Sequence, residues 1–262
     1  MGCGWLGTPL AQQLIREGYT VHGSTTSSEK LMHLQELGIL PFKISLSENG
    51  IDGPIDAFLK SAKVIVINVP PNLRGSHREN YEVKMKHLHD SIKGSSVARI
   101  IFISSTSVYG DLEGDVTETT VPHPETESGK QLLAVEEKFK YDPALETTII
   151  RFGGLIGPDR HPISFLSGKK DLSNGNHPIN LIHLDDCIHI IETIMNKGYW
   201  GEVFNGVHPL HPQKKEYYTD EARKRGLEIP IYLDSKNTQG KKVLPFNLVH
   251  FKKYEFQKSI VS

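Results

Sequence analysis

Four short stretches of the sequence carry residue types that could do chemistry at the ends of buried strands. Gly2-Cys3-Gly4-Trp5-Leu6-Gly7 spaces three glycines as Gly-x-Gly-x-x-Gly. Asn68-Val69-Pro70 and Ser104-Ser105 each follow an apolar run, and a third run ends at Phe152-Gly153. Glycine backbone, amide and hydroxyl groups at such ends can bind a phosphate-bearing ligand and orient a polar substrate.

The elements that must position these residues alternate along the chain. Apolar, β-branched runs predict strands buried on both faces, and stretches with an apolar stripe predict helices. The predicted strands are 19–23, 63–69, 98–104 and 147–151, and the predicted helices are 9–17, 29–37, 80–93 and 130–140. This alternation indicates an α/β fold, a Rossmann-type doubly wound parallel sheet with right-handed crossovers.

The composition of the sequence changes after Arg151. Glycine and proline become frequent, and helices are predicted at 185–196 and 214–226. We therefore divide the chain into a dinucleotide-binding Rossmann domain, 1–152, and a smaller C-terminal substrate lobe, 153–262. The lobe is expected to interleave with the last strands of the sheet.

The glycine pattern has the context of a phosphate-binding loop. Gly7 leads into a helix, with Thr8 as its expected cap and Pro9 in the first turn. In such loops the first glycine permits a tight turn, the second lets a pyrophosphate approach, and the third lets helix and strand pack closely. The helix amino terminus then offers free N–H groups to the phosphates. The alternative is a glycine-rich surface turn.

A buried strand normally precedes this loop, and here the loop starts at residue 2. That strand is central in the fold, so its loss would leave two strand edges unpaired. We expect roughly six to eight further residues before Met1, from an upstream start codon or lost from the sequence.

The end of the second strand bears on which dinucleotide binds. An NAD site usually places an acid there, but no acid precedes Glu29. Hydroxyls and a cation suit a 2′-phosphate, so NADP is favoured over NAD. The candidate residues are Ser24, Thr25, Thr26 and Lys30. In the alternative reading, the serines and threonines form a loop that caps the next helix.

Composition excludes several classes of protein. The 262 residues carry a formal net charge of −1, which argues against a nucleic-acid partner. No apolar run could span a bilayer, so no membrane partner is expected. Cys3 and Cys187 are too few for a disulfide framework, which favours the cytoplasm. The histidines are scattered without metal-ligand spacing, so no metal is expected.

Five motifs in order resemble the extended short-chain dehydrogenase/reductase superfamily, most closely its NAD(P)-dependent epimerase/dehydratase branch. They are Gly2–Gly7, Asn68-Val69-Pro70-Pro71, Phe102–Gly110, Arg151–Pro158 and Asn180–Asp186. The resemblance implies that the cofactor is bound by Gly2, Gly4, Trp5, Leu6, Gly7, Asn68, Val69, Pro70, Ser104, Phe152 and Gly153. It also places Ser105 at the catalytic Ser/Thr position, where its hydroxyl would hydrogen-bond the reacting oxygen.

Four residues are substrate-binding candidates. They are Tyr109, Arg151, Arg160 and His183. An arginine could meet a phosphate or carboxylate, although Arg151 could equally form an ion pair at a strand end. The alternative for His183 is a structural role.

The sequence departs from the family at its catalytic dyad, a tyrosine with a lysine four residues later. With Glu136 aligned to the family's glutamate, the tyrosine position holds Ser128 and the lysine position Leu132. A serine hydroxyl relays protons poorly at neutral pH. Lys130 is out of register, and Tyr141 lies too late. The chain thus resembles the atypical members of the superfamily.

Two functions follow as hypotheses. The first is an NAD(P)-dependent oxidoreductase or epimerase/dehydratase-like enzyme that acts on a small molecule such as a nucleotide sugar. The alternative is a non-catalytic NAD(P)-binding sensor or interaction protein. The resemblance also implies a homodimer through the helices at 80–93 and 130–140.

Overall fold

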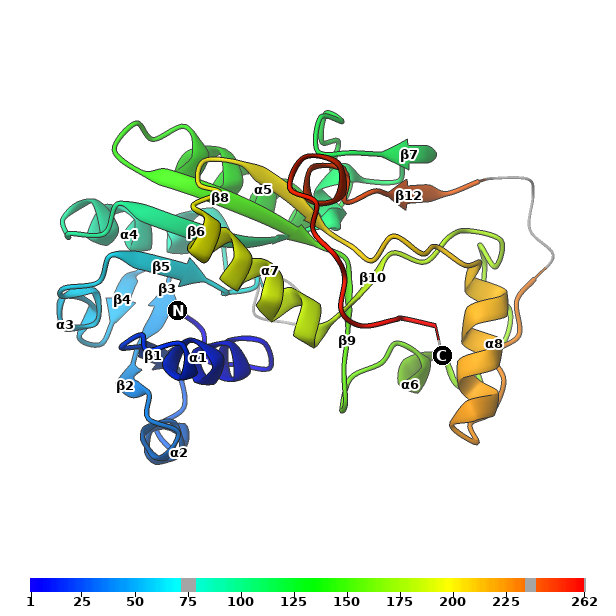
Figure 1. Ribbon diagram of the computed structural model, residues 1–262, viewed down its shortest axis with the longest axis horizontal. Helices are drawn as coiled ribbons and strands as arrows, with labels where there is room; N and C mark the ends of the chain where they lie inside the picture. The colour runs from blue at the N-terminus through cyan, green and yellow to red at the C-terminus, as the bar shows by residue number, and fades with distance from the viewer. Residues whose placement is uncertain (72–78, 234–238, 262) are drawn as a thin grey trace.

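The computed structural model describes residues 1–71, 79–233 and 239–261, and a parallel sheet of four strands lies at its centre (Figure 1). The sheet order is β11 (Val203–Gly206), β8 (Glu146–Phe152), β6 (Arg99–Ser105) and β5 (Val64–Ile67). Because β6 and β8 are buried on both faces, their sequences are continuous apolar runs.

A second parallel pair lies beside the central sheet without joining it. It consists of β1 (His22–Thr25) and β2 (Leu40–Lys43), with His22 opposite Leu40. The amino terminus lies between β1 and β5 (Figure 1). There the backbone N–H of Cys3 donates to Ser24, and that of Asn68 donates to Met1.

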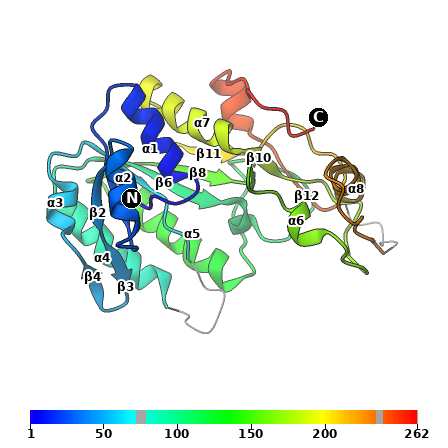
Figure 2. The same cartoon turned by 90° about the horizontal axis from the view of Figure 1, so that it is seen from below.

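Helices cover both faces of the sheet, as Figure 2 shows. One face packs against α4 (Tyr81–Lys93) and α5 (Glu127–Lys140). The other face packs against α1 (Gly7–Arg16) and α7 (Leu184–Lys197). Each layer has its own apolar core, as expected when a sheet is buried on both sides.

The remaining elements form the small lobe and the connections. In the lobe, β9 (Gly154–Ile156) pairs with β10 (Leu181–His183), and α6 (Ile163–Leu166) packs against α8 (Lys214–Lys224). A further parallel pair is formed by β7 (Gly114–Val116) and β12 (Lys241–Val243). The connections contain α2 (Lys30–Glu36), β3 (Ser45–Ser47), β4 (Gly50–Asp52), α3 (Ile55–Leu59), η1 (Thr106–Tyr109) and η2 (Asn247–Phe251).

The α/β, doubly wound fold predicted from the sequence is confirmed, with shifts at element ends. The helix predicted at 130–140 begins at Glu127, because the Thr126 side chain accepts from the N–H of Gly129 and caps it. The strand predicted at 19–23 begins only at His22. The hairpin of β3 and β4 was not predicted, because its short polar strands carry little periodic signal.

Candidate functional site

The three glycines of the loop occupy three different environments. Gly2 has a φ of +91°, and a Cβ there would lie 2.4 Å from the carbonyl oxygen of Asn68. A Cβ on Gly7 would lie 2.1 Å from the carbonyl oxygen of Gly2. A Cβ on Gly4 would meet no atom within 4 Å. The first and third glycines are therefore required by packing, whereas the second faces open space where a ligand can approach.

The helix that follows the loop begins without a side-chain cap. The N-cap residue of α1 is Leu6, and no side chain there accepts a hydrogen bond from the first turn. The prediction that Thr8 caps this helix is wrong, because Thr8 lies inside the first turn and its N–H donates to the carbonyl of Gly4. An uncapped amino terminus directs N–H groups and a partial positive charge toward the space beside Gly4.

Two polar side chains hold the glycine loop to its neighbours. The Ser24 hydroxyl accepts from the N–H of Gly2 at 2.9 Å, and the Asn68 amide donates to the carbonyl of Gly2 at 3.3 Å. Both residues were predicted to bind the cofactor directly, and the structure gives them the further role of holding the loop. Next to Asn68, the carbonyl of Val69 accepts from the Tyr81 hydroxyl, and Pro70 is exposed.

The other residues at the end of β1 differ in exposure. Thr25 is buried, and its hydroxyl accepts from the N–H of Ser27. Thr26 and Lys30 are exposed. Of the four candidates for a 2′-phosphate, these two have side chains that face solvent.

The amino group of Met1 should make the stability of this chain depend on pH. It donates to the carbonyl of Val66 at 2.5 Å, and burial lowers its pKa from 8.0 to about 6. The folded state thus binds fewer protons than the unfolded state between these values, so stability should fall by roughly 1–3 kcal/mol as the pH drops from 8 to 6. Urea unfolding across this range measures the effect.

Chemical acetylation of the same amino group supplies the control. The acetylated chain cannot titrate there, so its stability should fall less than that of the unmodified chain between pH 8 and pH 7, while the histidines whose pKa burial lowers contribute equally to both forms. Equal slopes for the two forms would contradict the assignment.

The hydroxyls at the end of β6 point in different directions. Ser104 is buried, and its hydroxyl donates to the Glu136 carboxylate. Ser105, the predicted catalytic residue, is partly exposed at the start of η1, where its hydroxyl accepts from the N–H of Ser107 at 3.1 Å. Ser105 therefore caps η1 and retains a hydroxyl proton to donate to a substrate.

Tyr109 and Arg151, both predicted to contact substrate, lie in a buried network. The Arg151 guanidinium donates to Glu136 from two nitrogens, at 2.6 and 3.2 Å, and to the Tyr109 hydroxyl at 3.0 Å. The Tyr109 hydroxyl donates to the Asn205 side chain at 2.8 Å. Burial alone lowers the pKa of Arg151, but the hydrogen bonds and charge of Glu136 outweigh it and raise that pKa. This is the strand-end ion pair considered from the sequence, and protein partners occupy both side chains.

The amino-terminal part of α5 shows what occupies the positions of the family's dyad. Leu132 is buried in the core beneath α5, whereas Ser128 is partly exposed. Gly129 packs against η1, since a Cβ there would lie 3.2 Å from the carbonyl oxygen of Ser107. Lys130 is exposed, and Tyr141 is 72% exposed beyond the end of the helix. The α5 helix therefore contains no tyrosine, and its first lysine, Lys130, is exposed.

The candidates after β8 are distributed around the loop that follows it. Phe152 is buried, and a Cβ on Gly153 would lie 2.6 Å from the carbonyl oxygen of Asn180. Arg160 stacks over the Trp5 ring, with its guanidinium carbon 5.1 Å from the ring centroid. His183 caps α7 by accepting from the N–H of Asp185 at 3.2 Å. The stacking brings Arg160 to the glycine loop, and His183 has the structural role considered as its alternative.

A lysine that no sequence motif indicated contacts η1 from the far end of the chain. The Lys241 ammonium donates to the carbonyls of Thr106, at 3.3 Å, and Gly110. Burial lowers the pKa of Lys241, while nearby Asp111 and Glu125 act in the opposite direction. Lys241 sits in a lysine-rich polar stretch with no motif, so only the pairing of β12 with β7 places it here.

The chain matches known proteins over most of its length. The model of the NAD dependent epimerase/dehydratase family matches residues 2–205. Protein YeeZ of Escherichia coli strain K12 is 36% identical over 246 residues, which cover 93% of this chain and 89% of YeeZ. In the described residues, no helix is long and apolar enough to cross a bilayer.

Solved structures show the same fold at low sequence identity. UDP-glucose 4-epimerase of Thermotoga maritima, solved with UDP-glucose, superposes with a TM-score of 0.80 at 18% identity, covering 99% of this chain and 93% of that one. UDP-glucuronic acid 4-epimerase of Bacillus cereus, in complex with UDP-glucuronic acid and NAD, superposes with a TM-score of 0.75 at 20% identity, covering 98% and 92%. With the family model matching residues 2–205, the chain belongs to the NAD dependent epimerase/dehydratase family.

Proposed function

We propose that the protein is an NAD(P)-dependent oxidoreductase or epimerase-like enzyme that acts on a nucleotide sugar without the usual Tyr-x-x-x-Lys dyad. The observation that carries the proposal is the open space at Gly4 beside the uncapped start of α1. This arrangement suits a pyrophosphate. The nucleotide sugars bound by the epimerases of like fold support the substrate class.

The residues present fit a bound dinucleotide. The N–H groups at the start of α1 would hold the pyrophosphate, and Ser24 and Asn68 keep the loop in the required shape. The nicotinamide would supply hydride transfer at the carboxyl ends of β6 and β8. Ser105 lies at that edge, where its hydroxyl would donate to the substrate oxygen.

The proposal is tested by turnover and binding in the same experiment. We expect NADPH or NADH to bind, and one of a panel of UDP- and dTDP-sugars to be epimerised or to change the nicotinamide absorbance. Ser105→Ala should lower kcat about 100-fold or more, while dinucleotide affinity changes by less than about threefold. Ser105→Thr keeps the hydroxyl and serves as the control for the lost cap on η1.

A second candidate, a dinucleotide-binding protein without turnover, is favoured by one observation. The position of the family's lysine holds Leu132, whose side chain is buried in the core and unavailable for proton transfer. Dinucleotide binding with no turnover of any sugar in the panel would support this candidate. Absence of dinucleotide binding would contradict both.

We further propose that NADP is the preferred cofactor, with the exposed Thr26 and Lys30 facing its 2′-phosphate. Lys30→Met should weaken NADPH binding about tenfold, because it removes a charge-assisted contact, and should leave NADH binding within about twofold. Calorimetric titration of both cofactors measures the ratio.

The control for Lys30→Met is the same substitution at Lys138, an exposed lysine in the last turn of α5. It lowers the net charge equally but lies on a different element, so it should leave the preference unchanged. Equal losses for NADPH and NADH in Lys30→Met would contradict the NADP assignment.

A further inference from the structure

Arg160 is a cation at the glycine loop that the proposed function does not use. Its guanidinium carbon lies 5.1 Å from the centroid of the Trp5 ring, and Trp5 stands between Gly4 and Leu6, the N-cap residue of α1. Arg160 is exposed. A guanidinium over an aromatic ring keeps its five N–H donors, which lie in its own plane. Arg160 therefore presents hydrogen-bond donors and a full positive charge beside the loop.

A tight turn of the small lobe brings Arg160 to this place. The N–H of Gly157 donates to the carbonyl of Arg160 at 2.8 Å, and the N–H of Arg160 donates to the carbonyl of Gly157 at 3.2 Å. Pro158 restricts the backbone inside the turn. A Cβ on Gly157 would lie 2.8 Å from the Trp5 ring and 3.3 Å from the Cβ of Leu184, so the turn packs closely against the glycine loop and the start of α7. Arg160 thus comes from a packed turn and not from a free surface segment.

The other tryptophan of the chain also carries an arginine, which provides a comparison. The guanidinium carbon of Arg99 lies 5.2 Å from the centroid of the Trp200 ring. Arg99 also donates from Nε to the Glu146 carboxylate at 3.0 Å, so its charge is paired. Within residues 1–71, 79–233 and 239–261, Arg160 forms no ion pair. The arginine at Trp5 thus lacks the anion that the arginine at Trp200 has.

The acidic side chains close to this turn do not neutralise Arg160. Asp185 and Asp186 lie in the first turn of α7, against which the turn packs. Asp185 Oδ2 is 3.4 Å from Lys258 Nζ, and the Asp186 carboxylate accepts from the N–H of Lys258 at 3.2 Å. Asp159 precedes Arg160 in the turn, is exposed, and forms no ion pair within the described part of the chain. The charge of Arg160 is therefore available to a ligand.

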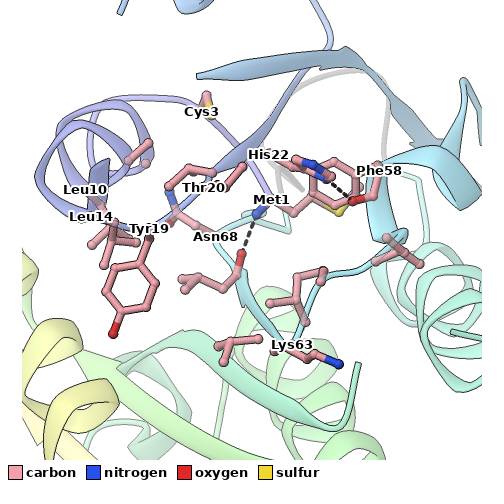
Figure 3. A pocket seen from close by; sticks show the side chains of 18 of the residues that line it. Met1, Cys3, Leu10, Leu14, Tyr19, Thr20, His22, Phe58, Lys63 and Asn68 are labelled. Carbon is pink, nitrogen blue, oxygen red and sulfur yellow. Dashed lines mark hydrogen bonds between the residues drawn. The ribbon is translucent and has the colours of Figure 1, made fainter. Parts of the chain in front are cut away.

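The cavity that adjoins the glycine loop between β1 and β5 is apolar where the two meet. Its volume is about 560 Å³, and Leu10 and Leu14 are among its lining residues. In Figure 3 Lys63, which also lines the cavity, lies at the end away from Cys3 of the loop. Burial lowers the pKa of the Met1 amino group there from 8.0 to about 6, so this group is largely uncharged at neutral pH. Neither group places a full positive charge at the loop.

A dinucleotide calls for such a charge, because both phosphates of its pyrophosphate are negative. Residues 2–7 contain no lysine or arginine, and the start of α1 contributes only a partial charge of about +0.5. Arginine can bind phosphate oxygens through two parallel N–H groups. A guanidinium that already rests on a ring loses less conformational freedom when it binds than a free side chain does. Arg160 on Trp5 therefore has the charge, the donors and the position that the loop lacks.

We propose that the Arg160 guanidinium, positioned by the Trp5 ring, donates hydrogen bonds to the pyrophosphate of the bound dinucleotide. This assigns Arg160 to the cofactor, whereas the sequence made it a candidate for substrate binding. It also makes the small lobe a part of the dinucleotide site, because the turn at Gly157–Arg160 belongs to that lobe. The inference rests on the dinucleotide binding of the proposed function and not on turnover.

The test measures the affinities for NADH, NADPH and ADP-ribose by calorimetric titration. Arg160→Met should weaken all three about tenfold or more, because each ligand carries the same pyrophosphate. Arg160→Lys keeps the charge but not the two parallel donors, so it should lose only about threefold. Arg99→Met is the matched control, since it removes an arginine from the other tryptophan, and it should leave each affinity within about twofold. The Tm of free Arg160→Met should change by less than about 2 °C, because the side chain is exposed.

Four outcomes would overturn the inference. Unchanged NADH affinity in Arg160→Met would do so while leaving the proposed function intact, and a loss confined to a UDP- or dTDP-sugar would place Arg160 at the substrate. A loss for NADPH alone would place Arg160 at the 2′-phosphate. An equal loss in Arg99→Met would show an effect of net charge. If the unsubstituted chain binds none of the three ligands, the proposed function fails, and this inference fails with it.

Discussion

Replacing Gly4 with alanine should weaken dinucleotide binding by at least about 30-fold and leave the stability of the free protein almost unchanged. A Cβ at this position meets no atom within 4 Å, so the folded chain accommodates it. The methyl group would occupy the space in front of the α1 amino terminus, where a pyrophosphate must come within hydrogen-bond distance of the backbone. A 30-fold loss corresponds to about 2 kcal/mol.

Gly7→Ala is the matched control, because it introduces the same methyl group three residues later. Its Cβ would lie 2.1 Å from a backbone oxygen of Gly2, so the loop must move and the protein should lose roughly 2–4 kcal/mol of stability. Urea unfolding with calorimetric titration separates the two variants. A large loss of stability in Gly4→Ala, or full dinucleotide affinity in that variant, would contradict the assignment of the loop.

Glu136→Gln should destabilise the protein by about 3–5 kcal/mol, the largest stability effect that we expect from a single charge change. The Glu136 and Arg151 side chains are 2% and 7% exposed, and Arg151 donates to both carboxylate oxygens. Removing the carboxylate charge leaves a buried guanidinium without its counter-ion, and this desolvation is no longer offset.

Glu146→Gln provides the comparison on the same sheet. Glu146 pairs with Arg99 across β8 and β6, but both side chains are about half exposed. An exposed ion pair contributes little, so this substitution should cost less than about 1 kcal/mol. Chemical unfolding of the two variants gives the difference in stability. Similar losses of stability would show that the buried Glu136–Arg151 pair contributes no more than the exposed pair.

Glu136→Gln also distinguishes a loss of stability from a loss of dinucleotide binding. Ser104, Glu136, Arg151 and Tyr109 form a connected buried network at the carboxyl ends of β6 and β8. In Glu136→Gln the remaining folded protein should still bind dinucleotide, because this network does not include the glycine loop.

Much of the fold could be predicted because its signals are local. The buried strands β5, β6 and β8 are continuous apolar runs, and the α1 helix follows from its apolar stripe and the glycine pattern before it. The departure at Ser128 and Leu132 was also visible, since it needs only the spacing to Glu136. Each of these inferences rests on residues a few positions apart, whose types determine backbone conformation and the face that is buried.

The tertiary structure decided which side chains meet. Arg151 was a candidate for substrate or for an ion pair, and only the packing of α5 against β8 brings Glu136 to it. Ser24 could be predicted as a hydroxyl at a strand end, but its bond to Gly2 depends on where β1 lies beside the amino terminus. Lys241 reaches η1 across more than a hundred residues of chain, through the pairing of β12 with β7.

The sequence by itself thus determined the layers, the position of the glycine pattern before α1 and the departure from the family's dyad at Ser128 and Leu132. The structure alone separated Thr26 and Lys30, which are exposed, from Ser24 and Thr25, which are buried. The physical reason is that backbone conformation follows from near neighbours, whereas burial and side-chain pairing depend on elements that the chain brings together only when it folds.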